Sequence, residues 1–278
     1  MQTLRHGQSC TPHLLPNEHP SMNSLLPQFR EALNTLDVSG SLQAWPEPLL
    51  IRRDGDWATY YAPFDHINTT ARVVLVGITP GLQQAGNALA ALQSALRRGE
   101  SEASALETAK KFASFSGPMR PNLIALLDSV GLPAVLGIAT TAELFGDRSS
   151  LVHYTSALRY PVTFKGNNYS GSGIAKNSFT RHELLRWFPE ETAKLPDAIY
   201  VPLGGAVEDA LQVLVGEGAL RNDQILGGLP HPSGANGERI AYFLGRKPRV
   251  ALSIKVDPEK LDAARVRALA TVKALAAV

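Results

Sequence analysis

Apolar residues gather along the chain in two patterns, short continuous runs and longer amphipathic stretches. The continuous runs predict buried strands at 72–76, 151–155, 198–203 and 249–254. The stretches in which apolar positions recur every three or four residues predict helices at 86–98, 120–130, 205–215 and 258–276. Strands that alternate with helices are typical of an α/β fold with three layers, in which helices cover both faces of a central, mostly parallel sheet.

The first 70 residues follow a different pattern. Residues 1–24 lack periodicity and are expected to form a surface arm, whereas residues 25–37 predict a short helix. A strand pair is predicted around the turn at Asp54 and Gly55. We therefore predict an N-terminal extension, residues 1–70, that packs on a core domain formed by residues 71–278. The Gly/Ser/Asn-rich stretch 165–178 is expected to be a long loop of that domain, of a length that is often functional.

Composition narrows the class of protein. The chain has 278 residues, 44% hydrophobic and 19% charged, which indicates an ordinary globular protein. A formal net charge of +2 is too small to predict a nucleic-acid partner by itself. The single cysteine, Cys10, excludes a disulfide framework and a four-cysteine zinc or iron–sulfur site. We see no signal peptide and no membrane-spanning run, so we expect a cytoplasmic protein with no membrane partner.

Two turns carry the candidate chemistry. "GITPG" at 77–81 follows a predicted strand, and "HPSGAN" at 231–236 follows a short apolar segment at 225–229 that is also a plausible strand. In open parallel sheets, ligands bind at the carboxyl ends of strands. Each turn alone is also typical of an ordinary strand-to-helix connection, and a lone histidine is more often structural than catalytic. The two turns in this order are more specific than either one.

Two further stretches, "FSGPMRPNLIALLDSVGLP" at 115–133 and "AIYVPLGGAVEDALQVL" at 198–214, complete a set of four landmarks. In this order they resemble the uracil-DNA glycosylase superfamily, over about residues 71–250. The resemblance implies that family's fold and a monomeric, monofunctional DNA glycosylase. Such an enzyme flips a damaged or modified pyrimidine out of DNA and hydrolyses its glycosidic bond without metal or cofactor, in repair or in defence against phages.

The resemblance also implies roles for single residues. The family's loop histidine donates a hydrogen bond to the oxygen of the departing base, which implies His231 as a catalytic residue. Thr79 stands where family members carry Asp or Asn, and it can orient water but cannot act as a base. Phe115 is expected to stack on the base, with Phe112 as the alternative and core packing as the ordinary role of either. The implied base-binding residues are Gly77, Ile78, Pro80, Gly81, Phe115, Thr155 and Ser156.

Contacts to DNA are expected from the second turn and from nearby basic residues. The resemblance implies phosphate or minor-groove contacts for Ser233, Gly234, Ala235 and Asn236, although Ala235 is a small wedge for a base stack. Two stretches, 151–186 and 237–255, are strongly basic, and a solvated face is the alternative for each residue in them. The basic residues are Arg159, Lys165, Lys176, Arg181 and Arg186, then Arg239, Arg246, Lys247, Arg249 and Lys255, of which Arg239 and Lys247 are predicted to bind phosphates.

The substrate prediction rests on a departure from the family pattern. Thr155 or Ser156 stands where the family's strand-end asparagine reads the edge of uracil. Small hydroxyls leave more space and can donate or accept, so we predict a modified pyrimidine, such as a glucosylated cytosine, in preference to plain uracil. Two other functions stay open. One is a catalytically inactive DNA-binding module on the same fold. The other is a nucleotide-binding enzyme, although the chain lacks a P-loop lysine and a dinucleotide fingerprint.

Overall fold

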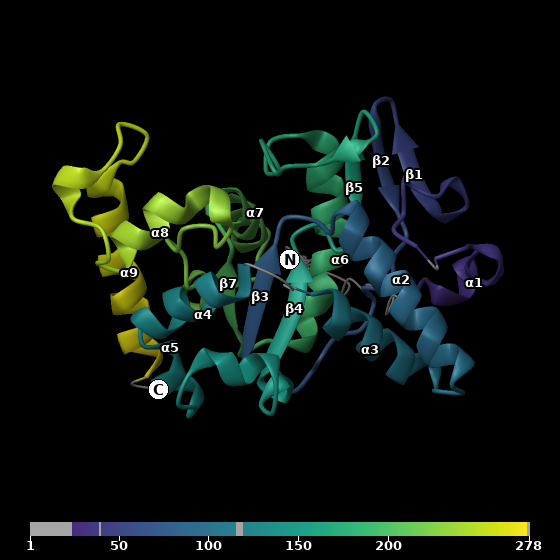
Figure 1. Cartoon of the computed structure of the whole chain (residues 1–278), viewed down its shortest axis with the longest axis horizontal. Coiled ribbons are helices and arrows are strands. Elements are labelled where there is room, and N and C mark those ends of the chain that lie inside the picture. The colour runs from purple at the N-terminus through teal and green to yellow at the C-terminus, as the bar shows by residue number, and fades with distance from the viewer. Residues whose placement is uncertain (1–23, 39, 115–118, 277–278) are drawn as a thin grey trace, which may run out of the picture.

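A parallel sheet of three strands forms the centre of the protein. The computed structural model describes residues 24–38, 40–114 and 119–276, so Phe115 lies outside the described residues. Strands β3 (Val73–Gly77), β4 (Val152–Ser156) and β7 (Ile199–Pro202) lie in the order β4-β3-β7, and all run parallel (Figure 1). They confirm three of the predicted strands. Because the strands are parallel, their carboxyl ends meet at one edge of the sheet.

Helices cover both faces of this sheet because alternate side chains of β3 are buried on opposite sides. Val73 and Leu75 belong to one core cluster, together with residues of α4 (Met119–Ser129), α5 (Leu132–Leu136) and α9 (Pro258–Leu275). Val74 and Val76 belong to the other, with residues of α6 (Ser178–Lys194) and α7 (Gly205–Gly216). The predicted α/β class is therefore confirmed, and β3 is apolar throughout because both its faces lie in the core.

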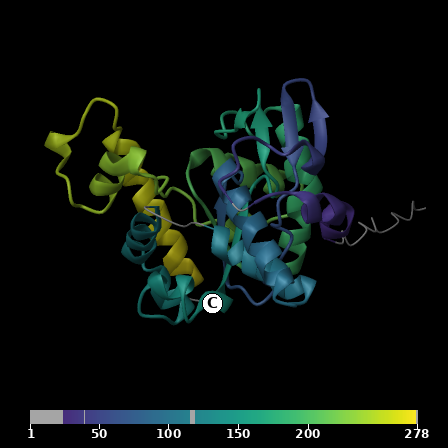
Figure 2. The same ribbon diagram turned by 45° about the vertical axis from the view of Figure 1, so that its right-hand side comes forward.

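A second, antiparallel sheet joins the N-terminal extension to the core domain. Its strands lie in the order β1 (Leu50–Asp54), β2 (Trp57–Tyr60), β5 (Val162–Phe164) and β6 (Asn167–Asn168). The β1–β2 hairpin is the strand pair predicted around Asp54 and Gly55, and β2 pairs with β5. A third core cluster beside this sheet contains residues of α1 (Leu26–Thr35), α2 (Leu82–Arg97) and α3 (Glu102–Ala113). The hairpin and α8 (Gly237–Phe243) lie on opposite sides of the parallel sheet (Figures 1 and 2).

Several predicted elements differ from the structure. The predicted strand at 249–254 is wrong: this segment is an exposed loop with a single 3-10 turn. The predicted short strand at 225–229 makes only one isolated bridge, between Ile225 and Tyr200. The sequence pattern did not predict α3, α6 or α8, and α2 begins at Leu82 rather than at residue 86. Single 3-10 turns lie at Glu47–Leu49, Thr141–Phe145, Ser149–Leu151, Asn222–Gln224, Gly234–Asn236 and Arg249–Ala251.

Candidate functional site

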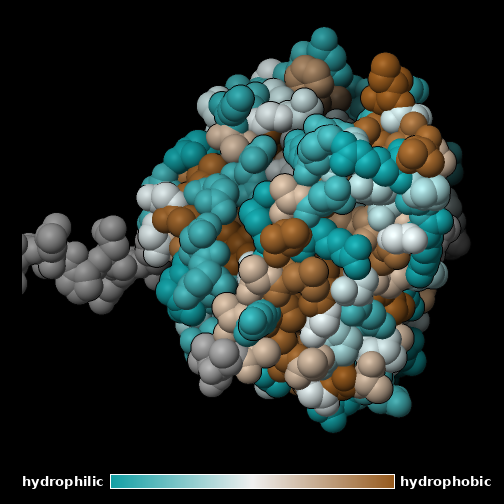
Figure 3. All heavy atoms as spheres, turned by 90° about the vertical axis from the view of Figure 1, so that its left-hand side faces the viewer, coloured by the Kyte–Doolittle hydropathy of each residue, from teal (hydrophilic) through white to brown (hydrophobic). Residues whose placement is uncertain are grey.

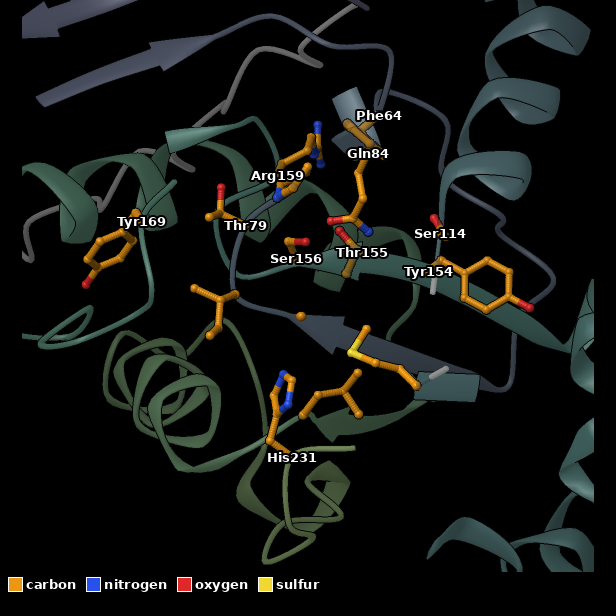
Figure 4. A pocket seen from close by; sticks show the side chains of 15 residues that line it. Phe64, Thr79, Gln84, Ser114, Tyr154, Thr155, Ser156, Arg159, Tyr169 and His231 are labelled. Atoms are coloured by element: carbon orange, nitrogen blue, oxygen red, sulfur yellow. The ribbon is translucent and has the colours of Figure 1, made fainter. Parts of the chain in front are cut away.

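A pocket of about 230 Å³ opens at the carboxyl ends of the parallel strands (Figure 4). Gly77 and Ser156 are partners in the register of β3 and β4, so the ends of both strands reach the pocket together. His231 lies across the pocket from Thr155 and Ser156. The structure thus brings together seven of the residues implied as catalytic or base-binding: Gly77, Ile78, Thr79, Pro80, Thr155, Ser156 and His231.

Backbone contacts fix the tautomer and the position of His231. The Ser233 N–H donates to the Nδ1 atom of His231 at 3.2 Å, so a neutral imidazole carries its proton on Nε2. Burial lowers the pKa of His231 below its ordinary value of 6.5, which favours this neutral form. The imidazole lies directly on Gly204, whose φ is +98° and where a Cβ atom would approach the Cβ of His231 to 3.2 Å. His231 is therefore a fixed, neutral hydrogen-bond donor.

Thr79 anchors its own loop. Its hydroxyl donates to the Tyr160 carbonyl at 3.2 Å and accepts from the Val162 N–H at 2.9 Å. A hydroxyl has one proton and two lone pairs. These two bonds use the proton and one lone pair, so the hydroxyl can still accept one hydrogen bond from a water molecule but cannot donate one. None of the described residues that line the pocket is acidic. The predicted water-orienting role of Thr79 is thus limited to a single acceptor position.

The 165–178 stretch packs against the 77–81 loop. The side chain of Asn168 accepts from the Leu82 N–H at 3.1 Å, at the first turn of α2. Gly171, at a φ of +90°, lies so close to Ile78 that a Cβ atom there would be 2.9 Å from its Cδ1 atom. This stretch also contributes Tyr169 to the pocket lining. Gly81 is the N-cap of α2 and is not among the described residues that line the pocket, so its role is in the loop itself.

Other pocket residues have no local sequence signal. Phe64 and Tyr169 supply aromatic surface, although Phe64 precedes β3 and Tyr169 follows β6. Phe112, the alternative stacking residue, is 63% exposed on α3 and is not among the described residues of the lining. The lining residues that sequence reasoning missed are Phe64, Gln84, Ser114, Met119, Tyr154, Tyr169 and Leu203, and Arg159 was expected on a basic surface instead. Gln84, Tyr154 and Arg159 lie within three residues of predicted site residues, whereas Phe64 and Tyr169 come from segments that only the tertiary fold brings to the pocket.

A buried charge cluster lies beside the pocket. The Arg159 guanidinium donates to Glu191 at 2.6 Å and to Glu190 at 2.9 Å, and His153 bonds to Glu191 at 3.0 Å. Although burial opposes ionisation, Arg159 and Lys110 hold the pKa of Glu191 below its ordinary range, while burial lowers the pKa of His153 to about 4. Arg159 is only 3% exposed. It is therefore a structural cation, and its assignment to a basic surface is wrong.

Lys110 of α3 supports the segment that carries Phe64. Its Nζ atom donates to the carbonyls of Phe64 at 3.0 Å and His66 at 2.7 Å. The side chain is 2% exposed, and burial lowers its pKa to about 8. Phe64 itself is 5% exposed. Helix α3, which the sequence pattern did not predict, thus fixes one wall of the pocket.

A second groove, of about 490 Å³, adjoins the pocket at His231. It is lined by four cationic side chains, none of which makes an ion pair with any residue that the structure describes: Arg239, Lys255, Lys260 and Arg267. Its two carboxylates accept hydrogen bonds from the backbone: Glu208 from the N–H of Gly228, and Asp257 from the N–H of Lys260. One of these cations, Arg239, is a residue for which we predicted phosphate binding. We call this feature the basic groove.

The remaining predicted contact residues lie around the basic groove or are neutralised. Ser233 begins the 3-10 turn Gly234–Asn236, which includes Ala235, and Asn236 lines the groove. The ammonium of Lys247 is 2.8 Å from Glu238, so its charge is paired. Cations of the 151–186 stretch are also engaged: Arg181 with Glu217, Lys165 with Asp56, and Arg186 over the ring of Trp187. Lys176 and Arg186 of this stretch make no ion pair with a described residue, whereas in the basic groove several such cations line one feature.

A metal site and a membrane-spanning helix are both absent from the residues that the structure describes. No group of three or more His, Cys, Asp or Glu side chains is placed there to hold a metal ion. None of the described helices combines the length and the apolar character that crossing a membrane requires.

Comparison with known proteins gives one relationship. No protein-family model matches the chain, and no solved structure matches it significantly. The chain is 36% identical over 238 residues to "Uncharacterized protein YoxB" of Bacillus subtilis (strain 168). The match covers 84% of this chain and 93% of YoxB. At this identity and coverage, the chain belongs to the same protein family as YoxB.

Proposed function

We propose that the chain is a monofunctional DNA glycosylase with a fold of the uracil-DNA glycosylase type. One observation carries the proposal: the fixed, neutral His231 donor faces the 77–81 loop and the end of β4 across a pocket of about 230 Å³. Pockets for drug-sized ligands measure roughly 300–1,000 Å³, so this one suits a single flat ring. An extruded pyrimidine base has that shape.

The proposed reaction needs no metal. The N-glycosidic bond breaks, its electron pair leaves with the base, and the sugar becomes positively charged. The Nε2–H of His231 donates to the base oxygen on which negative charge gathers. A water oxygen then bonds to the anomeric carbon of the sugar, and the proton released passes to the solvent or to the departed base. Because no described lining residue is acidic, the water is positioned rather than deprotonated.

The pocket supports a modified pyrimidine as the substrate. The Oγ1 atom of Thr155 is buried and has no hydrogen-bond partner among the described residues, and Thr155 lines the pocket. An unpartnered buried hydroxyl is costly unless a ligand completes it. Since a hydroxyl can donate or accept, Thr155 is compatible with a donor or an acceptor on the edge of the pyrimidine.

A catalytically silent DNA-binding module is the second proposal. Two observations favour it: the hydroxyl of Thr79 is engaged by Tyr160 and Val162, and the described lining holds no carboxylate that could activate water. In such a module the pocket would still hold an extruded base, but no glycosidic bond would break.

One assay separates the two proposals. Oligonucleotides that carry uracil, hydroxymethylcytosine or glucosylated cytosine are incubated with the protein and then cleaved with alkali at abasic sites. We expect His231→Ala to lower excision by roughly a hundredfold, as for the loss of a preorganised donor, with DNA affinity unchanged. His182→Ala is the matched control, because His182 is exposed on α6. If the protein excises none of these bases, the result favours the silent module. If it removes uracil fastest, the result contradicts the substrate proposal.

A further inference from the structure

The loop between α8 and α9, residues 245–257, exposes two large apolar side chains almost completely. Val250 is 96% exposed and Ile254 is 103% exposed, more than any other large hydrophobic residue that the structure describes. Both residues belong to segment 249–254, which the sequence pattern predicted to be a strand. Single exposed hydrophobic residues are normal on protein surfaces, but nearly complete exposure of two of them on one short loop makes this loop a candidate contact site.

Contacts from α8 hold this loop in place. The Glu238 carboxylate accepts from the Ser253 N–H at 2.8 Å and from its hydroxyl at 2.5 Å, and it pairs with Lys247. Arg239 donates to the Lys255 carbonyl at 2.7 Å. The loop is thus tied at both sides to two consecutive residues of one helix. A loop that is already ordered loses little conformational entropy when its tip binds.

The base of the loop adjoins the proposed site. Lys255 lines the basic groove together with His231 and Arg239. The loop projects beyond α8 on the side of the molecule to which the carboxyl ends of β3 and β4 point (Figures 1 and 2). Figure 3 looks at the left-hand side of Figure 1, and hydrophobic residues protrude among hydrophilic ones near the upper edge of that view. Apolar tips therefore stand next to a cationic groove that reaches the pocket.

We propose that loop 245–257 is a DNA-inserting element, in which Val250 and Ile254 enter a groove of the duplex and wedge apart the base stack beside the extruded nucleotide. The inference rests on the proposed binding of DNA. Apolar wedges flanked by Lys and Arg are how proteins unstack and bend DNA, and the methyl group of Ala235 is too small to do so. Cations of the basic groove hold the adjacent phosphates. This charge favours a polyanion over an apolar protein surface.

The test measures insertion of the loop into DNA on a duplex from which no base can be excised. Duplexes carry a stable abasic-site analogue, with the fluorescent base 2-aminopurine beside it, and unstacking raises its emission. We expect the full chain to raise this emission and the double variant Val250→Ser/Ile254→Ser to leave it near that of the free duplex, with roughly tenfold weaker binding. Excision from single-stranded substrates should match that of the wild type. Val266→Ser is the matched control, because Val266 is an apolar residue of α9 that is 66% exposed.

Each contrary outcome has a separate meaning. Equal emission and affinity for the double variant and the wild type would overturn the inference and leave the proposed function intact. Failure of the wild type to bind or cleave DNA would overturn the proposed function. Loss of binding to phosphatidylglycerol vesicles, or of self-association in ultracentrifugation, without an effect on DNA would assign the loop to a lipid surface or a second copy. As a second variant, Ile254→Trp should show quenched tryptophan fluorescence when duplex is added, and unchanged emission would contradict insertion.

Discussion

His231 is useful as a donor only while its ring is neutral and its proton stays on Nε2. Protonation would also require Nδ1 to give up the N–H of Ser233, and burial already lowers the pKa below 6.5. We therefore expect the imidazole to titrate below that value in ¹⁵N NMR spectra, with an Nε2–H signal at higher pH. Excision should consequently be independent of this group at about pH 7 and above. A midpoint above 6.5 would contradict the geometry.

The hydroxyl of Thr155 gives a prediction that separates function from stability. Thr155→Val keeps the shape of the side chain and removes a buried hydroxyl that has no partner among the described residues. We expect the free energy of unfolding to stay the same or to rise by about 1 kcal/mol, because no hydrogen bond is lost. Discrimination between pyrimidines should nevertheless weaken, since the base would lose its partner. Urea unfolding and the excision panel measure the two effects.

A matched control exists for this substitution. The hydroxyl of Thr59 in β2 is also buried and without a partner among the described residues, but Thr59 is not part of the described pocket lining. Thr59→Val should show the same small change in stability and no change in base preference. If both variants altered the base preference, Thr155 would not be a direct contact.

Helix α3 affects the site through Lys110. In Lys110→Met the carbonyls of Phe64 and His66 would lose their donor, and Glu191 would lose a nearby positive charge. We expect the free energy of unfolding to fall by about 2 kcal/mol, measured with urea, and excision to fall as Phe64 shifts. Lys111→Met is the control, because its ammonium makes an exposed pair with Glu107 and should change stability by roughly 0.5 kcal/mol or less. Full stability of Lys110→Met would contradict the anchoring role.

The same lysine gives stability a pH dependence of known sign. Burial lowers the pKa of Lys110 from 10.5 to about 8, so the folded protein holds this proton less tightly than the unfolded chain does. The contribution of this group to stability therefore rises as the pH increases from about 8 to 10.5. The difference in unfolding free energy between the wild type and Lys110→Met should grow over this range.

Elements with a continuous or strongly periodic apolar pattern could be predicted, and the others could not. Strand β3 is apolar throughout because both its faces are buried, and α9 begins with the Asp257 cap that its sequence indicates. Segment 249–254 also contains several apolar residues, but it pairs with no strand among the described residues. Hydrogen bonds from Ser253 to the Glu238 carboxylate hold it as a loop. Helix α3 buries mainly alanines, which give a weak pattern. Local sequence cannot show which distant segments supply a hydrogen-bond partner.

The residues of the candidate site also divide into those that a local sequence pattern predicts and those that it does not. Gly77, Thr155 and His231 could be predicted because they lie directly at strand ends or in a turn with a recognisable motif. Phe64 and Tyr169 reach the pocket through segments outside the parallel sheet, on either side of the β2–β5 pairing. Their contribution depends on that tertiary pairing, for which no local pattern exists.

At the scale of the molecule, formal net charge hides an uneven distribution. The total is only +2, yet the basic groove contains Lys255, Lys260 and Arg267 without ion pairs among the described residues. Some cations elsewhere are paired with carboxylates, as Arg181 is with Glu217. A polyanion would therefore be attracted to one side of the pocket, next to His231.

This distribution predicts which cations set the salt dependence of DNA binding. Each phosphate that a cation neutralises adds about 0.9 to the slope of log affinity against log salt concentration, so Lys260→Ala should flatten that slope by about one unit. Arg181→Ala should leave the slope unchanged, and Lys247→Ala should reduce it less than Lys260→Ala does, because Glu238 already pairs with Lys247. Fluorescence anisotropy over a series of salt concentrations measures all three slopes. Equal slopes for Lys260→Ala and the wild type would remove the basic groove from the DNA footprint.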